Sequence, residues 1–357
     1  MARVRKSREL TEFEKDLTTK ISGLTKPTGN PSNPETYSER SVKLFVANVY
    51  KTLKGLYSTQ TLTLGMLNND QEVREYLVSK YKNPNTRSNM LNAIIMVYRP
   101  DFMPEFSQKV LDRYMLARDE LIHTIRTAGM TNDNQKKVLD KDKGITSEDI
   151  FKLMKELRGE SLSVGKQITD RNKYMLYLIL YIHSQYPLRN DLAGMRVIRQ
   201  STFDKLDNDA KLKDDFMVLQ GTKRIFFVRS NYKTKSKYGT LVNEITDTPL
   251  KKAIHIWLES GLKIYEDPQK LDYTYLLSTS NGSPISKNNL SQFLTKHTKA
   301  YLGLPISTTL LTKIFDKTPK SLETATEKQL QEMKRQADIR GHSLMMKKTI
   351  YANPNNA

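Results

Sequence analysis

The sequence contains no cysteine, which excludes disulfide scaffolds, cysteine-ligated zinc fingers and thiol nucleophiles. Its five histidines are scattered, and no pair has the spacing of metal ligands. No stretch approaches the roughly 20 apolar residues that a membrane span needs. The opening residues, MARVRKSRELTEFEKDL, lack the apolar segment of a secretion signal. We therefore expect no metal, no membrane partner and a location inside the cell, or in a particle assembled there.

Acidic residues are scarce relative to basic ones. The chain has 39 Asp and Glu against 58 Lys and Arg, a formal net charge of +19. This surplus predicts a polyanionic partner, because protein cations displace the counterions of nucleic-acid phosphates. The alternative is a role in solubility alone, which Asp and Glu would serve at least as well.

Composition divides the 357 residues into four parts. Residues 1–34 are basic and end in a stretch rich in Pro, Gly, Asn and Ser, which predicts a flexible basic arm with room for a short helix near 12–24. Residues 35–130 have helical periodicity and predict a small all-α DNA-binding domain. Residues 131–147 are polar and predict an interdomain linker. Residues 148–357 form the second, larger domain.

Strand patterns occur only in the second domain, in residues 195–200, 214–222 and 224–246. Within the last of these, two apolar runs flank a lysine-rich turn, which predicts a β-hairpin with a long loop. Helical periodicity accounts for most of the remainder. The predicted fold class is therefore mainly α with a small antiparallel β-sheet. In the first domain, Asn85 or Thr86 is the predicted N-cap of a helix that runs to about residue 99.

Four motifs occur in a fixed order along the chain. They are YPLRNDL, SNYKTKSKYG, ISTTLLTKIF and GHSLMMKKTIY. Each is weak by itself, but their order and spacing together resemble the tyrosine recombinase (phage integrase) family from about Tyr37 to Tyr351. The RNDL and YKTxxKYG forms look most like integrase-like proteins of large DNA viruses and related mobile elements.

The resemblance implies an N-terminal core-binding domain, an α+β catalytic domain and a known chemistry. A tyrosine hydroxyl attacks a DNA phosphate and forms a 3′-phosphotyrosyl link, without metal, ATP or other cofactor. Matched by position, Arg189 clamps the phosphate, Lys233 protonates the leaving oxygen, His342 donates a hydrogen bond, and Tyr351 is the nucleophile. Lys235 and Lys237 are alternatives to Lys233, because the alignment of a hairpin can slip.

The chain departs from the family at one motif. By our alignment Thr309 and Thr312 replace the histidine and the arginine of the family's His-x-x-Arg motif. Loss of a phosphate-binding guanidinium should cost several kcal/mol of transition-state stabilisation, by analogy with roughly 2.7–4 kcal/mol for one oxyanion donor. Lys313 is a partial substitute, although it is a point charge on a different side of the helix.

Three functions stay open at this stage. The first is an integrase-like recombinase, impaired at Thr309 and Thr312. The second is a catalytically inactive double-stranded-DNA-binding, packaging or virion protein on the same fold. The third is an RNA-binding or structural helical protein whose resemblance is accidental. The first implies a homotetramer on two DNA sites. The expected location is intracellular, in the host nucleus or at a cytoplasmic viral replication site, or packaged in a virion.

Individual residues also have simpler interpretations. Arg189 could interact with the dipole of the helix before it, and the hairpin lysines could form an ordinary solvated turn. Asp191 either orients Arg189 or is a solvated surface carboxylate. The cations that we expect to contact DNA phosphates, rather than to specify bases, are Lys43, Lys51, Arg87, Lys235, Lys237 and Lys313.

Overall fold

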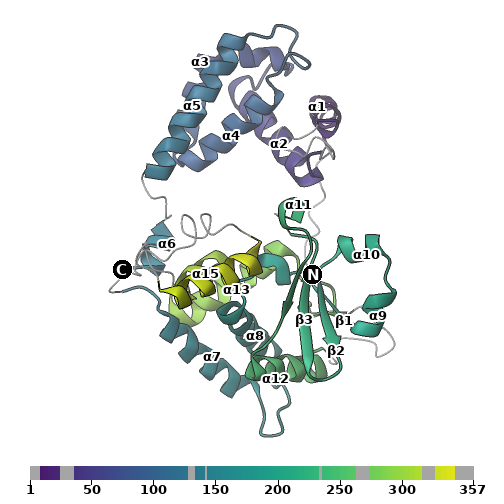
Figure 1. Cartoon of the computed structure of the whole chain (residues 1–357). Helices are drawn as coiled ribbons and strands as arrows, with labels where there is room; N and C mark the ends of the chain where they lie inside the picture. Colours follow the sequence, from purple (N-terminus) through teal and green to yellow (C-terminus); the bar gives the residue numbers. More distant parts are fainter. Residues whose placement is uncertain are drawn as a thin grey trace. The chain divides into compact units, whose positions relative to one another are not determined.

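The computed structural model describes residues 9–24, 36–127, 133–140, 143–232, 235–262, 274–280, 282–315 and 326–341. The chain divides into two compact units, residues 1–130 and 131–357. Each unit has a hydrophobic core of its own, and Figure 1 shows the elements of each.

The N-terminal unit is helical. Its elements are α1 (Glu12–Ser22), α2 (Glu39–Leu56), the 3-10 helix η1 (Leu64–Asn68), α3 (Asp70–Lys80), α4 (Pro84–Val97) and α5 (Gln108–Thr127). In α2 the apolar stripe at three- and four-residue steps is buried, as its periodicity predicts. The predicted N-cap of α4 is wrong by two or three residues. Asn83 is the cap, and its side chain accepts a hydrogen bond from the Asn85 amide, because Pro84 fits the first helical turn.

Part of the predicted basic arm belongs to the core of this unit. Helix α1 begins with a capping box, in which Thr11 and Glu14 satisfy each other's backbone amides. Leu17 and Ile21, one turn apart, are fully buried in the N-terminal core. Residues 12–22 are therefore a packed helix, and the prediction of a flexible arm is wrong for them because the apolar stripe outweighs the basic composition.

The C-terminal unit combines helices with one sheet. Its helices are α6 (Asp133–Val138), α7 (Ser147–Ser161), α8 (Arg171–Gln185), η2 (Asn190–Leu192), α9 (Gln200–Lys205), α10 (Asn208–Lys213), α11 (Lys235–Tyr238), α12 (Thr248–Ile256), the π-helical turn η3 (Trp257–Gly261), α13 (Lys287–Leu302), α14 (Thr308–Phe315) and α15 (Glu327–Arg340). Val138 and Leu139 are buried in the core of this unit. The segment 131–147, which composition predicts as a linker, thus supplies core residues.

Helix α8 is the centre of the C-terminal unit. Every residue from Tyr174 to Leu180 is buried, as expected for a helix that is apolar on all sides. Helices α7, α12 and α14 pack around it, and its last turn leads directly to the RND triplet. No helix in the described part of the chain is both long and apolar enough to cross a membrane.

The sheet has the strand order β4-β3-β2-β1-β5. Its strands are β1 (Arg196–Arg199), β2 (Phe216–Gln220), β3 (Arg224–Arg229), β4 (Leu241–Glu244) and β5 (Thr274–Tyr275). The predicted hairpin is confirmed as the antiparallel pair β3–β4. The sheet is mixed rather than wholly antiparallel, because β1 and β2 pair in parallel. Helices α9 and α10 lie between those two strands in sequence and provide the return connection that parallel pairing needs.

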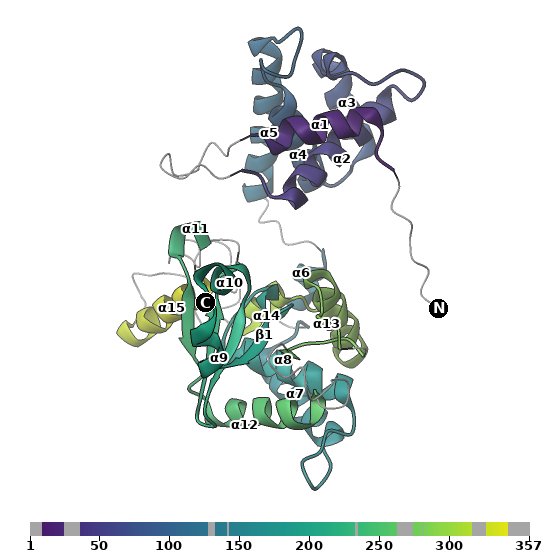
Figure 2. The same ribbon diagram turned by 90° about the vertical axis from the view of Figure 1, so that its right-hand side faces the viewer.

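Both faces of the sheet are covered. Ile225 and Phe227 point into the main core, whereas Val228 belongs to a small cluster on the other face. Phe203 of α9 packs against that small cluster. Figure 2 shows α9 and α10 beside the strands and α11 and α12 at opposite ends of the β3–β4 hairpin. Period-two alternation in β3 thus serves two packing layers.

Candidate functional site

Arg189 lies in the turn that follows α8. The C-cap of α8 is Tyr186, and Arg189 comes three residues later, immediately before η2. Tyr186 and Leu188 are buried, whereas Arg189 itself is half-buried. A turn anchored in the core therefore carries a partly accessible guanidinium.

Asp191 is not a solvated surface carboxylate, and its ion pair is with Arg229 rather than with Arg189. It is buried, and its Oδ2 accepts a hydrogen bond from Nη1 of Arg229 at 3.0 Å. Arg229 ends strand β3 and is completely buried. The pair joins the RND turn to the base of the hairpin, although the two residues are 38 positions apart.

Sequence reasoning missed Arg229. In β3, alternate residues Ile225 and Phe227 belong to the main core, so period two places Arg229 on the same face. An arginine on a core face is a signal for a buried ion pair, and it could have been found from the alternation. Burial lowers the pKa of Arg229, while the negative charge of Asp191 acts in the opposite direction. An arginine guanidinium keeps its charge in proteins, so Arg229 and Asp191 form an ion pair.

A second buried carboxylate, Asp215, fixes the start of the hairpin loop. Its Oδ1 accepts hydrogen bonds from the backbone amides of Ser230 at 2.8 Å and Asn231 at 2.7 Å. Burial raises the pKa of Asp215, and the two amide donors partly offset that rise. Asp215 precedes β2, so it ties the hairpin loop to the neighbouring strand.

The hairpin loop is closed at its base by further polar contacts. Ser230 and Thr240 share a hydrogen bond between hydroxyls at 3.0 Å. The Tyr232 hydroxyl donates to the Gly239 carbonyl at 2.8 Å. Burial raises the pKa of Tyr232, and the positive charges of Arg229 and Arg189 oppose the rise. The ring centre of Tyr232 lies 5.5 Å from Cζ of Arg229, so the hairpin loop lies beside the Arg229–Asp191 pair that holds the RND turn.

The third motif meets the same turn. The Thr308 hydroxyl, at the first position of α14, donates to Oδ1 of Asn190 at 3.0 Å. Asn190 is the neighbour of Arg189 in sequence, so the start of α14 lies against the RND turn. Three of the four motifs, separated by as many as 118 residues, thus converge in the C-terminal unit.

The two threonines at the family's His-x-x-Arg positions have different surroundings. Thr309 is exposed. Thr312 is buried, and its hydroxyl donates to the Thr308 carbonyl of the same helix at 3.0 Å. Lys313 is half-buried, and desolvation lowers its pKa. Lys313 is therefore the one basic residue of α14. It follows the position that carries the arginine in the family motif, so its side chain leaves the helix in a different direction.

The remaining residues of the predicted site are only partly described. Lys233, His342 and Tyr351 lie outside the described residues, as does the side chain of Lys237. Lys235 begins α11, and its Nζ donates to the Leu212 carbonyl of α10 at 3.0 Å. Of the four groups that we expect around one phosphate, the described residues therefore include Arg189 alone, together with the base of the hairpin that carries Lys233.

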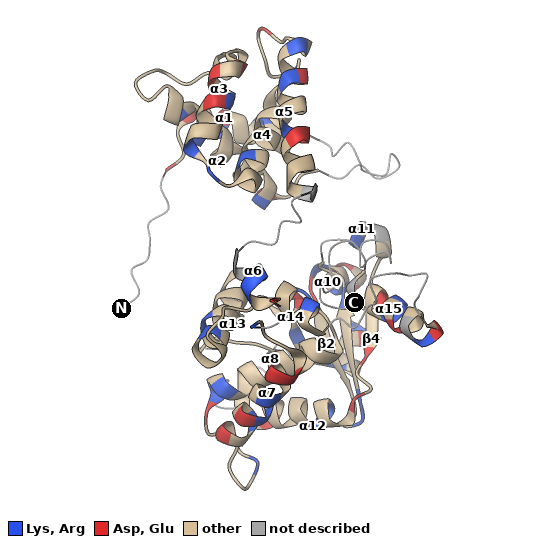
Figure 3. Ribbon diagram, turned by 90° about the vertical axis from the view of Figure 1, so that its left-hand side faces the viewer, with Lys and Arg blue, Asp and Glu red and all other residues tan. Residues whose placement is uncertain are grey.

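The candidate DNA contacts of the N-terminal unit differ in their partners. Lys43 forms an ion pair with Glu39, one helical turn earlier, and this contact lowers the pKa of Glu39. Lys51, on the same helix, is exposed. Arg87 is half-buried on α4, and its Nε is enclosed without a hydrogen-bond partner in the described part of the chain. Figure 3 shows Lys and Arg on several helices of both units.

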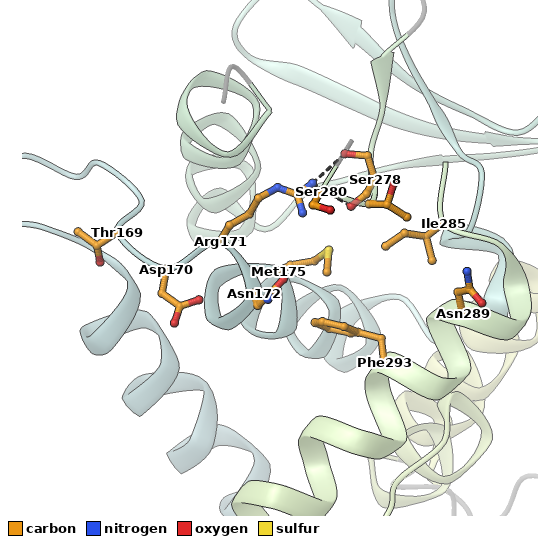
Figure 4. A pocket seen from close by; sticks show the side chains of 11 residues that line it. Thr169, Asp170, Arg171, Asn172, Met175, Ser278, Ser280, Ile285, Asn289 and Phe293 are labelled. Carbon is orange, nitrogen blue, oxygen red and sulfur yellow. Dashed lines mark hydrogen bonds between the residues drawn. The ribbon is translucent and has the colours of Figure 1, made fainter. Parts of the chain in front are cut away.

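A pocket of the C-terminal unit, separate from the RND turn, lies beside the start of α8 (Figure 4). Its one arginine, Arg171, is engaged in the fold. The guanidinium donates to the carbonyl of Gly261 and to both oxygens of Ser278, at 2.8–3.2 Å. It also lies 5.1 Å from the ring centre of Trp257. Arg171 therefore links the start of α8 to the end of η3 and to the segment after β5, and this pocket is assigned no ligand.

No group of three or more His, Asp or Glu side chains that could hold a metal ion occurs among the described residues. Of the described titratable groups near the RND turn, Asp191 and Asp215 are engaged with Arg229 and with backbone amides. Arg189 is the partly accessible cation beside these engaged groups, and a guanidinium is a group that binds oxyanions.

Comparison with known proteins gives similarity of structure alone. No protein-family profile matches the sequence, and no curated protein matches it. Over most of its length the chain is structurally similar to two tyrosine recombinases. One is the XerH site-specific recombinase bound to its difH substrate before cleavage, with 12% identity and a TM-score of 0.39 over 95% of this chain and 91% of that one. The other is the Tn1549 transposon integrase in complex with transposon right-end DNA, with 14% identity and a TM-score of 0.35 over 82% and 95%.

Proposed function

We propose that this chain binds double-stranded DNA and breaks and rejoins it as a tyrosine-type strand transferase, slowed by the threonines at positions 309 and 312. The observation that carries the proposal is the convergence of the Arg189 turn, the base of the lysine hairpin and the start of α14. These are three of the four motifs on which the resemblance rests. A net charge of +19 is consistent with a DNA partner.

In the proposed reaction the hydroxyl oxygen of Tyr351 attacks the phosphorus of the scissile phosphate. A new P–O bond to tyrosine forms while the bond to the 5′-oxygen breaks. The phenol gives up its own proton to water as it attacks, and the departing 5′-oxygen takes a proton from the ammonium of Lys233. One phosphodiester is exchanged for another, so the step needs no external energy source. Arg189 and His342 donate hydrogen bonds to the non-bridging oxygens, where negative charge accumulates.

The buried pair of Arg229 and Asp191 has a positioning role in this proposal. Arg229 is fully enclosed, so it contacts Asp191 rather than DNA. By holding Asp191 it fixes the turn that carries Arg189 and neutralises a carboxylate beside the phosphate. A rigid turn matters because misplacement of a catalytic group by about 1 Å can cost roughly 100-fold in rate.

A suicide substrate tests the proposal directly. A duplex nicked near the scissile phosphate traps the covalent intermediate, because the short 5′-fragment diffuses away. We expect a slow covalent protein–DNA adduct with the full chain, and none with Tyr351→Phe. Arg189→Ala should reduce adduct formation at least 100-fold. An adduct that persists in Tyr351→Phe would contradict the assignment of the nucleophile.

The second candidate function is DNA binding without cleavage, as in a packaging or virion protein. The surroundings of Thr312 favour it, because its buried hydroxyl is satisfied within α14 and offers no cation to a phosphate. The double change Thr309→His with Thr312→Arg separates the two functions. A gain of cleavage indicates a weakened active site, whereas unchanged inactivity with intact duplex binding indicates a binder.

Assembly and location follow from whichever function holds. Under the first proposal the protein acts as a homotetramer on two DNA sites, in the nucleus or at a cytoplasmic site of viral replication. Sedimentation of the chain with duplexes that contain its site tests the tetramer.

A further inference from the structure

A groove runs across the C-terminal unit between α7, α8 and α12, and the proposed DNA chemistry does not use it. Its volume is about 890 Å³. The residues that line it repeat at helical spacing on three helices, so each helix contributes one face. They are Phe151, Met154, Lys155, Arg158 and Gly159 of α7, Tyr174, Tyr177, Tyr181 and Gln185 of α8, Pro249, Lys252, Ala253 and Ile256 of α12, and Leu162, Ser163 and Lys166 of the loop after α7.

The rim of the groove is positively charged. Lys155, Arg158, Lys166 and Lys252 all line it, and all four are exposed. No Asp or Glu lines it, and none of the four cations forms an ion pair with a described residue. Elsewhere on α7 and α8 a cation does have an acidic partner, since Lys173 of α8 forms an ion pair with Glu160 of α7 at 2.7 Å. The four unpaired cations therefore leave room for acidic groups of a partner.

The floor of the groove is apolar and aromatic. Tyr174 and Tyr177 are buried, so they expose little ring surface to the groove. The hydroxyls of Tyr174 and Tyr181 donate to the Ala253 carbonyl and to Asp247. The Tyr177 hydroxyl forms no hydrogen bond with a described residue. Phe151 is 44% exposed, and its ring centre lies 5.6 Å from that of Phe315 on α14.

The loop that closes one end of the groove is held in a defined shape. Leu162 and Ile168 form an isolated antiparallel bridge, and the Ile168 amide donates to Ser260 Oγ at 3.3 Å. Lys166 has a φ of 61°, a left-handed conformation that non-glycine residues rarely adopt. The turn that Ser163 and Gln167 close by a backbone hydrogen bond accounts for this conformation, and it places Lys166 at the rim.

We propose that this groove is a docking site for an acidic amphipathic helix of a partner protein. The apolar side of such a helix covers the floor, and its Glu and Asp side chains meet the four rim cations. Three helix faces at regular spacing form the kind of groove in which a fourth helix packs. Single-stranded nucleic acid fits less well, because buried tyrosine rings offer no open face on which bases stack.

The end of the groove that α12 lines is away from the hairpin loop, because α11 and α12 are at opposite ends of β3–β4 (Figures 1 and 2). Its other end, at Gln185 in the last turn of α8, is four residues before Arg189. A partner that fills the whole groove therefore comes close to the turn that carries Arg189.

The probe for the test is a fluorescent synthetic helix of about 14 residues, long enough for the roughly 20 Å that four helical turns span. It carries Glu on one face and Leu and Phe on the other. We expect binding by the full chain that weakens at least tenfold in the double variant Arg158→Glu with Lys252→Glu. The matched control is Lys296→Glu with Lys299→Glu on α13, which changes the net charge equally at exposed positions.

The outcomes separate the docking site from general charge attraction. Equal weakening in both double variants, or no binding by the parent, overturns the proposal. A second probe that has Ser in place of Leu and Phe should bind at least tenfold more weakly than the first, and equal binding overturns the role of the floor. If a single-stranded oligonucleotide depends on Arg158 and Lys252 while the acidic helix does not, the groove is a nucleic-acid site instead.

Discussion

At the scale of single residues, the pair of Arg229 and Asp191 connects the stability of the fold to the candidate site. A buried charge whose partner is removed is strongly unfavourable, whereas replacing both partners by apolar groups is often neutral. We expect Arg229→Met to lower the free energy of unfolding by about 3–5 kcal/mol, because it leaves the carboxylate of Asp191 buried without its cation. Urea denaturation of the full chain measures the loss.

The double variant Arg229→Met with Asp191→Leu is the control for that experiment. Its loss of stability should be much smaller than that of Arg229→Met alone, since no buried charge remains. If the two losses are equal, the ion pair is not the cause, and the packing of the arginine stem is.

Asp215 gives a prediction in pH. Burial raises its pKa in the folded state, so the folded protein binds this proton more tightly than the unfolded chain does. As pH rises through the window from the ordinary Asp pKa to the raised one, this group therefore lowers the free energy of unfolding. In Asp215→Asn the amide oxygen can still accept from Ser230 and Asn231. The variant should be more stable than the parent at pH 7, with a smaller difference near pH 4.

Denaturation with urea at the two pH values measures that difference. Asp209→Asn, at an exposed position on α10, is the control and should show little change between them. A stability gain in Asp215→Asn that is the same at both values would mean that the buried charge is not its source.

The motif predicts Arg189 as a site residue, and that role stays a prediction. The sequence does not predict the partner of Asp191, because Arg229 is 38 positions away. Nothing local in RNDL distinguishes a buried carboxylate from a solvated one. Only the alternation in β3, taken together with an arginine on its core face, could have indicated the pair.

At the scale of elements, the periodicity of apolar residues predicts the helices and strands that bury one face or both, and it does not predict those that bury none. The stripe of α2 and the apolar strands β2 and β3 were recognisable because each buries one face or both. The short helices α9 and α10 have no fully buried residues, so they leave no periodic signal. Without them, the parallel pairing of β1 with β2 could not be foreseen, and the sheet was expected to be antiparallel.

Two glycines give opposite predictions for the same substitution. Gly261 ends η3 against Trp257, and a Cβ placed on it would lie 2.4 Å from Cε3 of that ring. Both residues are buried, so Gly261→Ala should lower the free energy of unfolding by about 1–3 kcal/mol by overpacking.

Gly159, in α7, has nothing within 4 Å of its Cβ position, and Gly159→Ala should raise the free energy of unfolding by about 0.5–1 kcal/mol through helix propensity. Thermal and urea denaturation of both variants measure the two signs, and a gain at Gly261 would contradict the packing of η3.

At the scale of the whole molecule, the net charge of +19 indicates a polyanionic partner but not which cations touch it. Only a cation that contacts a phosphate contributes to the dependence of binding on salt, because only it releases a condensed counterion. Lys51 is exposed on α2 and has no ion-pair partner among the described residues. If it contacts DNA, Lys51→Ala should reduce the slope of log affinity against log salt by about 0.9. The loss should be the same on unrelated duplexes, since phosphate contacts carry no sequence information.

Lys223→Ala provides the comparison, because it removes the same charge from the turn between β2 and β3, at the opposite end of β3 from Lys235 and Lys237. Lys223→Ala should shift affinity slightly through the overall field and leave the slope unchanged. Fluorescence anisotropy on two unrelated duplexes, each at several salt concentrations, separates the two effects. Equal slopes for both variants would mean that Lys51 acts only through net charge, and the prediction that Lys51 of the N-terminal unit contacts a DNA phosphate would then be wrong.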